Sequence, residues 1–382
     1  MMQPSRKRVQ FMSLLRPLLL IAIAAMITYH TFCSCSSKPE SVLKDHDRDI
    51  LDTPSAEQTD EATVHIAVCI TGETYLAYAI TVIKSIVLFT DHRLQYYVVS
   101  EDRSGIALEK EIKTWPSAFK NRISVLPIEL NCTELFTSSL FRTQQNNGRR
   151  TKTCVFVTLV NSDVIKVHTE KVIFLDVDVF AFDNIASVWK VFSEFDERHI
   201  MATAAGSRYL KLKQYQHKEE HIMRGKRGIN SGIVLIHLEN LRKQSSFSYD
   251  LIISSKLKYS GLNPVNSQDL LVLYFTIHPQ QHYPLSCDLH FQRGVERCHG
   301  SHNRFNCSEA ETTGIVMYHA LTDDKFTTGP FIDIMTCFEK LDLSQLMTAR
   351  QCFNSGIQQI KKKQCPKGGE LLRNLETAVA KI

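Results

Sequence analysis

Two aspartates separated by one residue follow an apolar run and have the clearest chemical potential in the chain. Asp176 and Asp178 come directly after Val172 to Leu175, whose side chains predict a buried strand. Carboxylates at i and i+2 can converge on one divalent metal once the chain turns, and such a metal bridges to phosphate oxygens. Because α/β sheets bind ligands beyond the carboxyl ends of their strands, this position favours a metal site over the alternative, a solvated turn.

Two classes of enzyme carry two such acids directly after an apolar strand. In metal-dependent glycosyltransferases the acids hold a metal on the diphosphate of a nucleotide sugar. In phosphatases that resemble the haloacid dehalogenases, the first acid is a nucleophile. Residues 172–179 fit both patterns, and Asp323, Asp324 and Lys325 can be aligned with the later phosphatase motifs. The rest of the chain has to separate the two classes.

Strands and helices alternate around the two aspartates. Apolar runs predict strands at 64–70, 94–100, 123–128 and 172–175, and helical spacing predicts helices at 74–89, 105–114 and 154–168. This alternation predicts an α/β fold whose sheet contains parallel strands.

Three further stretches separate the two classes. Residues 228–236 read as a small polar turn leading into a strand, and Ser267-Gln268-Asp269 opens a predicted helix. His319 ends a predicted strand at 314–318, and Lys325 follows it by six residues. With the two aspartates, these motifs resemble the retaining glycosyltransferases of the glycogenin-like family (family 8), whereas the phosphatases lack the middle two.

The resemblance covers roughly residues 64–340 and is strongest to the glucoside xylosyltransferase branch. The stretches that carry it are 67–73, 83–85, 267–271, Cys287, Cys298 and 307–319. It implies a GT-A type, Rossmann-like nucleotide-sugar-binding domain with a mixed, mostly parallel sheet.

The resemblance also implies a role for each motif residue. The implied ligands of Mn²⁺ are Asp176, Asp178 and His319. The implied donor-binding residues are Asp176, Gly228, Asn230, Ser231, Gly232, Gln268 and Lys325, and the implied catalytic residues are Gln268, Asp269 and Lys325. Asp269 has a structural alternative as a first-turn acid favoured by the helix dipole.

The implied reaction moves xylose from UDP-xylose to O-linked glucose on EGF-like repeats of a glycoprotein, with retention, forming an α-1,3 bond. Gln268 is a poor nucleophile, which favours attack on the sugar face that UDP leaves. Ser267 stands where the family usually has an acid. Two alternatives stay open: another UDP-sugar transferase, similar to the bifunctional xylosyl-/glucuronyltransferases, or an inactive glycan-binding relative.

The N-terminus predicts a membrane anchor. Residues 11–32 contain Arg16 as their only charge, and a helix needs roughly 20 apolar residues to span a bilayer. The basic residues Arg6, Lys7 and Arg8 precede it, so the positive-inside rule makes residues 1–10 a cytoplasmic tail. We expect a type II protein of the Golgi or endoplasmic reticulum membrane, with a lumenal stem at 33–63. A cleaved signal peptide is the alternative.

Cysteines and glycosylation sequons agree with a lumenal location. Eleven cysteines are many for a cytosolic protein, and sequons begin at Asn131 and Asn306. Cys69 reads as part of a buried strand, and the cysteines left for open pairing beyond the membrane edge are Cys132, Cys154, Cys287, Cys298, Cys307, Cys337, Cys352 and Cys365. A zinc site at 298–307 is less favoured than a disulfide-pinned loop.

Composition and net charge limit the class of protein and the kinds of partner. Hydrophobic residues make up 43% and charged residues 22%, which are values of a globular protein. A net charge of +5 over 382 residues is too small to indicate nucleic acid as a partner. We expect one catalytic domain at 64–340, followed by a solvated, disulfide-tethered tail at 341–382.

Overall fold

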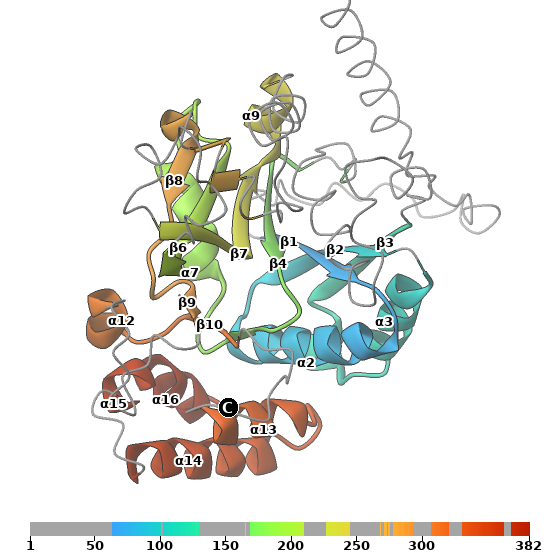
Figure 1. Ribbon diagram of the computed structural model, residues 1–382. Coiled ribbons are helices and arrows are strands. Elements are labelled where there is room, and N and C mark those ends of the chain that lie inside the picture. Colours follow the sequence, from blue (N-terminus) through green and yellow to red (C-terminus); the bar gives the residue numbers. More distant parts are fainter. Residues whose placement is uncertain are drawn as a thin grey trace, which may run out of the picture.

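A computed structural model describes most of the chain from residue 63 onward. The described residues are 63–100, 102–129, 165, 169–209, 227–244, 268, 271–272, 274–275, 278–292, 307–320, 331–362 and 368–382. Figure 1 shows a central sheet with helices against it and a helical group at the C-terminal end.

The main sheet has seven strands in the order β3-β2-β1-β4-β7-β6-β8. Their bounds are β1 Thr63–Ile70, β2 Arg93–Ser100, β3 Ile123–Glu129, β4 Lys171–Leu175, β6 Met201–Tyr209, β7 Arg227–His237 and β8 His282–Pro284. The strands β3, β2, β1 and β4 are parallel, β7 is antiparallel to both β4 and β6, and β8 is parallel to β6. The predicted α/β fold with a mixed, mostly parallel sheet is confirmed.

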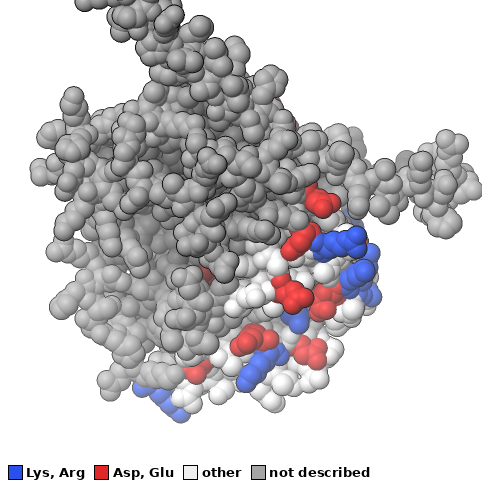
Figure 2. All heavy atoms as spheres, turned by 45° about the vertical axis from the view of Figure 1, so that its right-hand side comes forward, with Lys and Arg blue, Asp and Glu red and all other residues white. Residues whose placement is uncertain are grey.

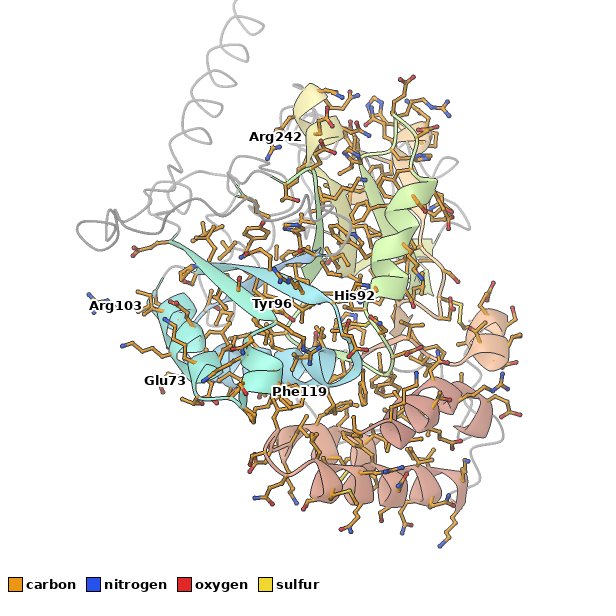
Figure 3. The ribbon with its side chains drawn as sticks, turned by 180° about the vertical axis from the view of Figure 1, so that it is seen from behind. Glu73, His92, Tyr96, Arg103, Phe119 and Arg242 are labelled. Atoms are coloured by element: carbon orange, nitrogen blue, oxygen red, sulfur yellow. A yellow bond between two sulfur atoms is a disulfide. The ribbon has the colours of Figure 1, made fainter. Side chains whose placement is uncertain are left out.

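The parallel part of the sheet forms as its apolar runs predict. The helices that accompany it are α2 Glu73–Phe89, α3 Ser104–Lys113 and α4 Ser117–Lys120. Tyr96 of β2 and Phe119 of α4 are buried in the same core (Figure 3). Strand β4 is buried along Val172 to Leu175, as expected for a central strand covered on both faces. The helix predicted at 154–168 falls almost entirely outside the described residues.

A smaller sheet of three strands adjoins the carboxyl end of β4. It has the order β5-β10-β9, with β5 at Val179–Ala181, β9 at Phe291–Gln292 and β10 at Met317–His319. The strand predicted at 314–318 is therefore misplaced. Gly314 has a φ of 90° and ends helix α12 at Ser308–Thr313, so the chain becomes a strand only three residues later and includes His319.

Short helices lie between the strands along the chain. They are α7 Ala186–Trp189, the 3-10 helix η3 Lys190–Glu194, α9 Leu238–Lys243 and the 3-10 helix η5 Pro279–Gln281.

Residues beyond 340 form helices that pack in the core, so the expectation that this tail is solvated is wrong, whereas the expected disulfide tether is present between Cys337 and Cys352. The C-terminal helices are α13 Ile332–Glu339, α14 Leu346–Lys362, α15 Gly368–Leu371 and α16 Arg373–Ala380. Helix α2 lies between the main sheet and the pair α13 and α14 (Figure 1). Phe353, Leu372 and Leu375 are each 0% exposed. Phe338 of α13 stacks on Phe180 of β5 with ring centroids 5.4 Å apart. Aromatic burial of this kind holds the helices against the small sheet.

The structure defines disulfide partners that the sequence leaves open. Cys287 is bonded to Cys307, and Cys337 is bonded to Cys352. Cys69 is also disulfide-bonded, although it lies in β1 and is only 3% exposed. Setting Cys69 aside as a strand residue was therefore wrong, because a buried strand position does not prevent a bond to another segment.

Within the described residues, no helix is long and apolar enough to cross a membrane. The predicted anchor at 11–32 lies outside them. Acidic and basic side chains are interspersed over the described part of the face in Figure 2. On α3, for example, Glu109 forms an ion pair with Lys113 at 2.6 Å.

Candidate metal and donor site

The turn after β4 holds the two aspartates by backbone contacts on both sides. The Asp176 backbone N–H donates to the Gly232 carbonyl of β7 at 2.9 Å. The Asp178 carbonyl accepts from the backbone N–H of Ala320, directly after β10, at 3.0 Å. The turn is thus tied to both sheets, which fixes where its carboxylates point.

His319 completes a cluster with these two acids. Its Nε2 lies 3.2 Å from Oδ1 of Asp178, and the three potential ligand atoms of Asp176, Asp178 and His319 all lie within 4.8 Å of one another. The antiparallel pairing of His319 with Val179 brings this histidine beside the turn, although it stands 141 positions after Asp178 in the sequence. His319 is 3% exposed, whereas both aspartates are partly buried.

The charges in this cluster are mutually dependent. Burial and the neighbouring Asp178 charge raise the pKa of Asp176 to about 7, and His319 partly opposes this rise. Burial acts to lower the pKa of His319, but the two acids outweigh it, so this pKa is raised. Two carboxylates this close repel each other unless a proton or a cation lies between them.

The donor set fits a divalent metal. Two carboxylates and one imidazole from three positions leave other coordination sites open, as a metal that also binds a diphosphate requires. An imidazole ligand suits Mn²⁺, whereas Mg²⁺ and Ca²⁺ favour all-oxygen sites. A bound cation would offset the repulsion between Asp176 and Asp178, which adds to burial in raising the pKa of Asp176.

Gly232 is required for His319 to occupy its place. A Cβ built on Gly232 would lie 2.2 Å from Cε1 and 2.3 Å from Nδ1 of the His319 ring, well inside van der Waals contact. The Gly232 backbone N–H donates to the Asn230 side-chain oxygen at 2.8 Å. The Asn-Ser-Gly motif therefore has a local structural role in addition to the donor binding that its resemblance implies.

Gln268 lies next to this motif. Its Nε2 donates to Oγ of Ser231 at 3.1 Å, and it is helical together with the described residues 271–272 and 274–275. Ser231 is 4% exposed, so one end of Gln268 is held at a buried position. The contact with β7 thus holds the amide near the cluster. It also brings together the motif at 267–269 and the Asn-Ser-Gly motif.

Gly228 lies further along β7, away from the metal cluster. A Cβ on Gly206 of β6 would meet the Gly228 carbonyl oxygen at 3.1 Å, so the two backbones approach closely there. Asp269, Lys325, Asn131 and Asn306 lie outside the described residues. The roles implied for them stay predictions.

The sequence gives no indication of one residue that contacts the cluster. Nε2 of His290 lies 3.1 Å from Nδ1 of His319, and the two rings stack with centroids 5.3 Å apart. Burial, followed by the proximity of His319, holds the pKa of His290 well below its usual value. The parallel pairing of β9 with β10 creates this contact, and no spacing rule identifies it in advance.

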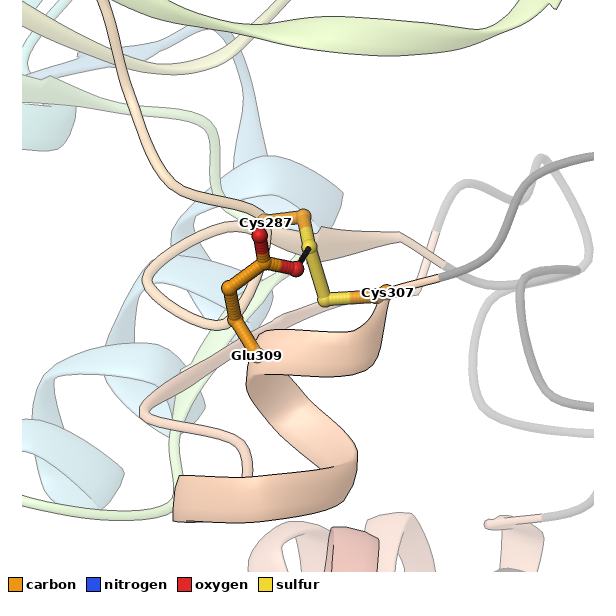
Figure 4. Close-up of side chains that lie close together, drawn as sticks. All are labelled: Cys287, Cys307 and Glu309. Atoms are coloured by element: carbon orange, nitrogen blue, oxygen red, sulfur yellow. Dashed lines mark hydrogen bonds between the residues drawn. A yellow bond between two sulfur atoms is a disulfide. The ribbon is translucent and has the colours of Figure 1, made fainter.

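A second group of potential ligands is not a metal site. Cys287, Cys307 and Glu309 lie close together (Figure 4). The two cysteines form a disulfide, so neither can supply the thiolate that binds zinc. The same bond removes Cys307 from the zinc site considered at 298–307.

Comparison with known proteins agrees with this geometry. The model of the family described as Glycosyl transferase family 8 matches residues 65–319. Glucoside xylosyltransferase 2 of Mus musculus is 25% identical over 271 residues, which are 68% of this chain and 57% of that relative. Glucoside xylosyltransferase 1 of Danio rerio is 21% identical over 309 residues, which are 78% of this chain and 72% of that relative. The chain thus covers less than two thirds of the length of the mouse relative.

The fold has a counterpart among solved structures. The crystal structure of mouse xyloside xylosyltransferase 1 in its apo form superposes with a TM-score of 0.53 at 19% identity. The match covers 69% of this chain and 99% of the mouse protein. At this identity the likeness concerns the fold, a GT-A-like arrangement of sheet and helices.

Proposed function

Because the chain belongs to glycosyl transferase family 8, we propose that it transfers a sugar from a UDP-sugar to a hydroxyl group, with retention at the anomeric carbon. The cluster of Asp176, Asp178 and His319 carries this proposal, since its ligand atoms lie within 4.8 Å of one another beyond the carboxyl end of β4. Ligands of α/β sheets bind at that edge. The Asn230–Gly232 motif and Gln268 adjoin the cluster. In this proposal the donor sugar binds beside them while the metal holds its diphosphate.

In this proposal Asp176, Asp178 and His319 hold a divalent metal, with Mn²⁺ the expected ion. When bound, this metal would neutralise the charge that develops on the departing diphosphate. Asp176 would also approach the ribose of the donor. The Gly232 contact and the Ala320 N–H keep both acids in place before the substrate arrives, so little reorganisation is needed in the reaction.

The bond between the anomeric carbon and UDP breaks while the acceptor oxygen attacks the same face of the sugar. We assign Gln268 to the opposite face, where its amide would favour the oxocarbenium-like ring without forming a bond to it. Lys325 would neutralise the leaving diphosphate as a point charge, and a UDP oxygen would accept the acceptor proton. Asp269 and Gly228 would complete the donor pocket.

For the donor we propose UDP-xylose, and for the acceptor O-linked glucose on EGF-like repeats, joined by an α-1,3 bond. The likeness to glucoside xylosyltransferases supports this choice. Xylose lacks the exocyclic CH₂OH of glucose, so the pocket should exclude hexoses by a clash near C5. Ser267 is smaller than the acid usual at its position and would relax that exclusion.

The decisive experiment compares donors on one acceptor. The full chain, purified in detergent, is incubated with an O-glucosylated EGF-like repeat, Mn²⁺ and UDP-xylose, UDP-glucose or UDP-glucuronic acid in turn. We expect the repeat to gain one pentose by mass and an α linkage by NMR. Gain of a hexose or a uronic acid would overturn the donor assignment, and absence of both transfer and UDP release with every donor would overturn the enzyme assignment.

Asp178→Asn tests the metal site within the same assay. It keeps the shape of the side chain and removes one charged ligand, so Mn²⁺-dependent UDP release should fall by about 100-fold or more while the thermal transition persists. Asp183→Asn is the matched control, because Asp183 lies five residues away and its oxygen accepts from the backbone N–H of Asn184. Equal activity of the two variants would remove Asp178 from the site.

We also propose that the protein is anchored as a type II protein in the Golgi or endoplasmic reticulum membrane. The charge pattern around residues 11–32 and the disulfides at Cys69, Cys287 and Cys337 support an oxidising lumen. In intact microsomes a C-terminal tag should resist added protease until detergent is present. Digestion without detergent would contradict this orientation.

A further inference from the structure

His290 is a buried imidazole that contacts the candidate metal cluster without belonging to it. Its side chain is 0% exposed, and it lies directly before β9, which pairs with the strand that carries His319. Nε2 of His290 and Nδ1 of His319 are 3.1 Å apart, which is a hydrogen-bond distance. One of these two nitrogens must therefore carry the proton between them.

The proton's position follows from what His319 has to do. Nε2 of His319 is the nitrogen on the cluster side, 3.2 Å from Oδ1 of Asp178. A neutral imidazole that coordinates a metal through Nε2 carries its proton on Nδ1. That proton then points at His290, so Nε2 of His290 must be the acceptor.

We propose that His290 is a positioning residue that holds His319 in the Nδ1-protonated form and in the ring orientation required for metal binding. This inference rests on the proposed metal site. Metal-binding histidines generally donate their second N–H to a carboxylate, a carbonyl oxygen or water, and here a second histidine supplies the acceptor. Gly232 lies against the same His319 ring, so the ring is restrained by both neighbours.

The environment of Nδ1, the second ring nitrogen of His290, indicates that this residue does not serve stability alone. Among the described residues, Nδ1 of His290 has no hydrogen-bond partner although the atom is buried. A buried polar atom without a partner costs free energy that an apolar side chain of similar volume avoids. Replacement by leucine should therefore leave the fold intact, or make it more stable, while metal binding weakens.

Three variants separate the hydrogen bond from the bulk of the ring. His290→Leu keeps apolar volume and removes the acceptor. His290→Gln places its amide oxygen near the position of Nε2, whereas His290→Asn carries the same amide one methylene shorter, near the position of Nδ1. The matched control is His282→Leu, because the His282 ring is also hydrogen-bonded to a side chain, that of Thr203, and does not belong to the cluster.

The measurement is the affinity of the full-length protein for Mn²⁺ alone, from the EPR signal of the free ion, together with a thermal melt without metal. We expect His290→Leu and His290→Asn to bind about 10- to 100-fold more weakly, and His290→Gln and His282→Leu to bind within about threefold of the wild type. If His290→Leu does not fold, the Gln and Asn pair decides alone.

Two results would overturn the inference and are distinct from failure of the proposed function. Wild-type affinity in a folded His290→Asn variant would show that the acceptor is not needed. Equal losses in the Gln and Asn variants would show that ring shape matters instead of the hydrogen bond. If the wild-type protein itself binds no Mn²⁺, the proposed metal site fails, and this inference fails with it.

Discussion

The parallel part of the molecule, formed by β1 to β4, and the part formed by β6 to β10 differ in the polar side chains that they bury. In the parallel part, the buried polar side chains are hydroxyls, such as Ser85, whose Oγ donates to the Val82 carbonyl at 2.7 Å. In the part formed by β6 to β10, the buried polar side chains include Asn230, Gln281, His290, Gln292 and His319. Imidazoles and amides have two polar ends to satisfy, so they require long-range partners. The first part is built for stability, and the second also holds groups that can do chemistry.

The largest effect is expected from Gly232→Ala, a substitution in the part that holds the candidate metal site. Because the new Cβ would lie 2.2 Å from Cε1 of His319, the ring must leave the position in which its Nε2 lies 3.2 Å from Oδ1 of Asp178. We expect Mn²⁺ affinity to fall by about 100-fold or more, measured by EPR of the free ion. Gly369→Ala is a control, since its Cβ would lie 3.7 Å from Lys361. Retained affinity in the Gly232 variant would show that the ring can shift without loss of the site.

A substitution in the parallel part should lower stability and leave the Mn²⁺ affinity unchanged. Ile83 of α2 is 0% exposed in the core, so Ile83→Ala should lower the free energy of unfolding by about 2–5 kcal/mol. Urea denaturation measures this change. The folded fraction should bind Mn²⁺ with wild-type affinity, because Ile83 packs in the apolar core and is not one of the three ligands of the cluster. A loss of affinity in folded protein would mean that the two parts are coupled more closely than their contacts indicate.

The same difference decides how much can be predicted from sequence. Strand β4 and the two aspartates are predicted because four consecutive apolar residues specify a covered strand and the acids adjoin it. The joining of Asp178 with His319 follows only from the resemblance to a family, since no local rule links residues so far apart. His290 is not predicted at all, because its contact depends on the pairing of β9, a strand of two residues.

The C-terminal region shows a second limit of sequence reasoning. Phe353, Ile357 and Ile360 have the spacing of one helix face, which predicts a helix but not the surface that covers it. In the structure this face is buried with Phe338 and the small sheet. Gly314 shows the reverse case, where an apolar run suggests a strand but a positive φ ends a helix.

The disulfide between Cys337 and Cys352 tests how much the C-terminal helices contribute. A bond that closes 15 residues of chain stabilises a protein by about 3 kcal/mol in the chain-entropy estimate. The double replacement by serine should lower the unfolding free energy by about 2–4 kcal/mol, measured by urea denaturation at 25 °C. Mn²⁺ affinity in folded protein should not change. A loss of affinity would show that α13 and α14 position β10.

The smallest expected effect is a pH dependence that belongs to the part formed by β6 to β10. Burial, together with the nearby His199, lowers the pKa of His282 to about 4, below the value of about 6.5 in the unfolded chain. Between these two values the unfolded chain binds a proton that the folded protein does not, so stability falls as the pH falls from about 6.5 to 4. Above about pH 7 this histidine contributes no pH dependence.

His282→Gln isolates this contribution. Glutamine cannot be protonated but can still hydrogen-bond to Thr203, whose Oγ1 lies 2.8 Å from Nε2 of His282. We expect wild-type protein to lose about 1–3 kcal/mol more stability than the variant between pH 7 and pH 4.5, measured by urea denaturation at each pH. The side chain is partly exposed, which reduces the effect below the full shift in pKa. Parallel pH profiles of the two proteins would show that His282 has the same pKa in the folded and unfolded states, and that other groups set the loss of stability in acid.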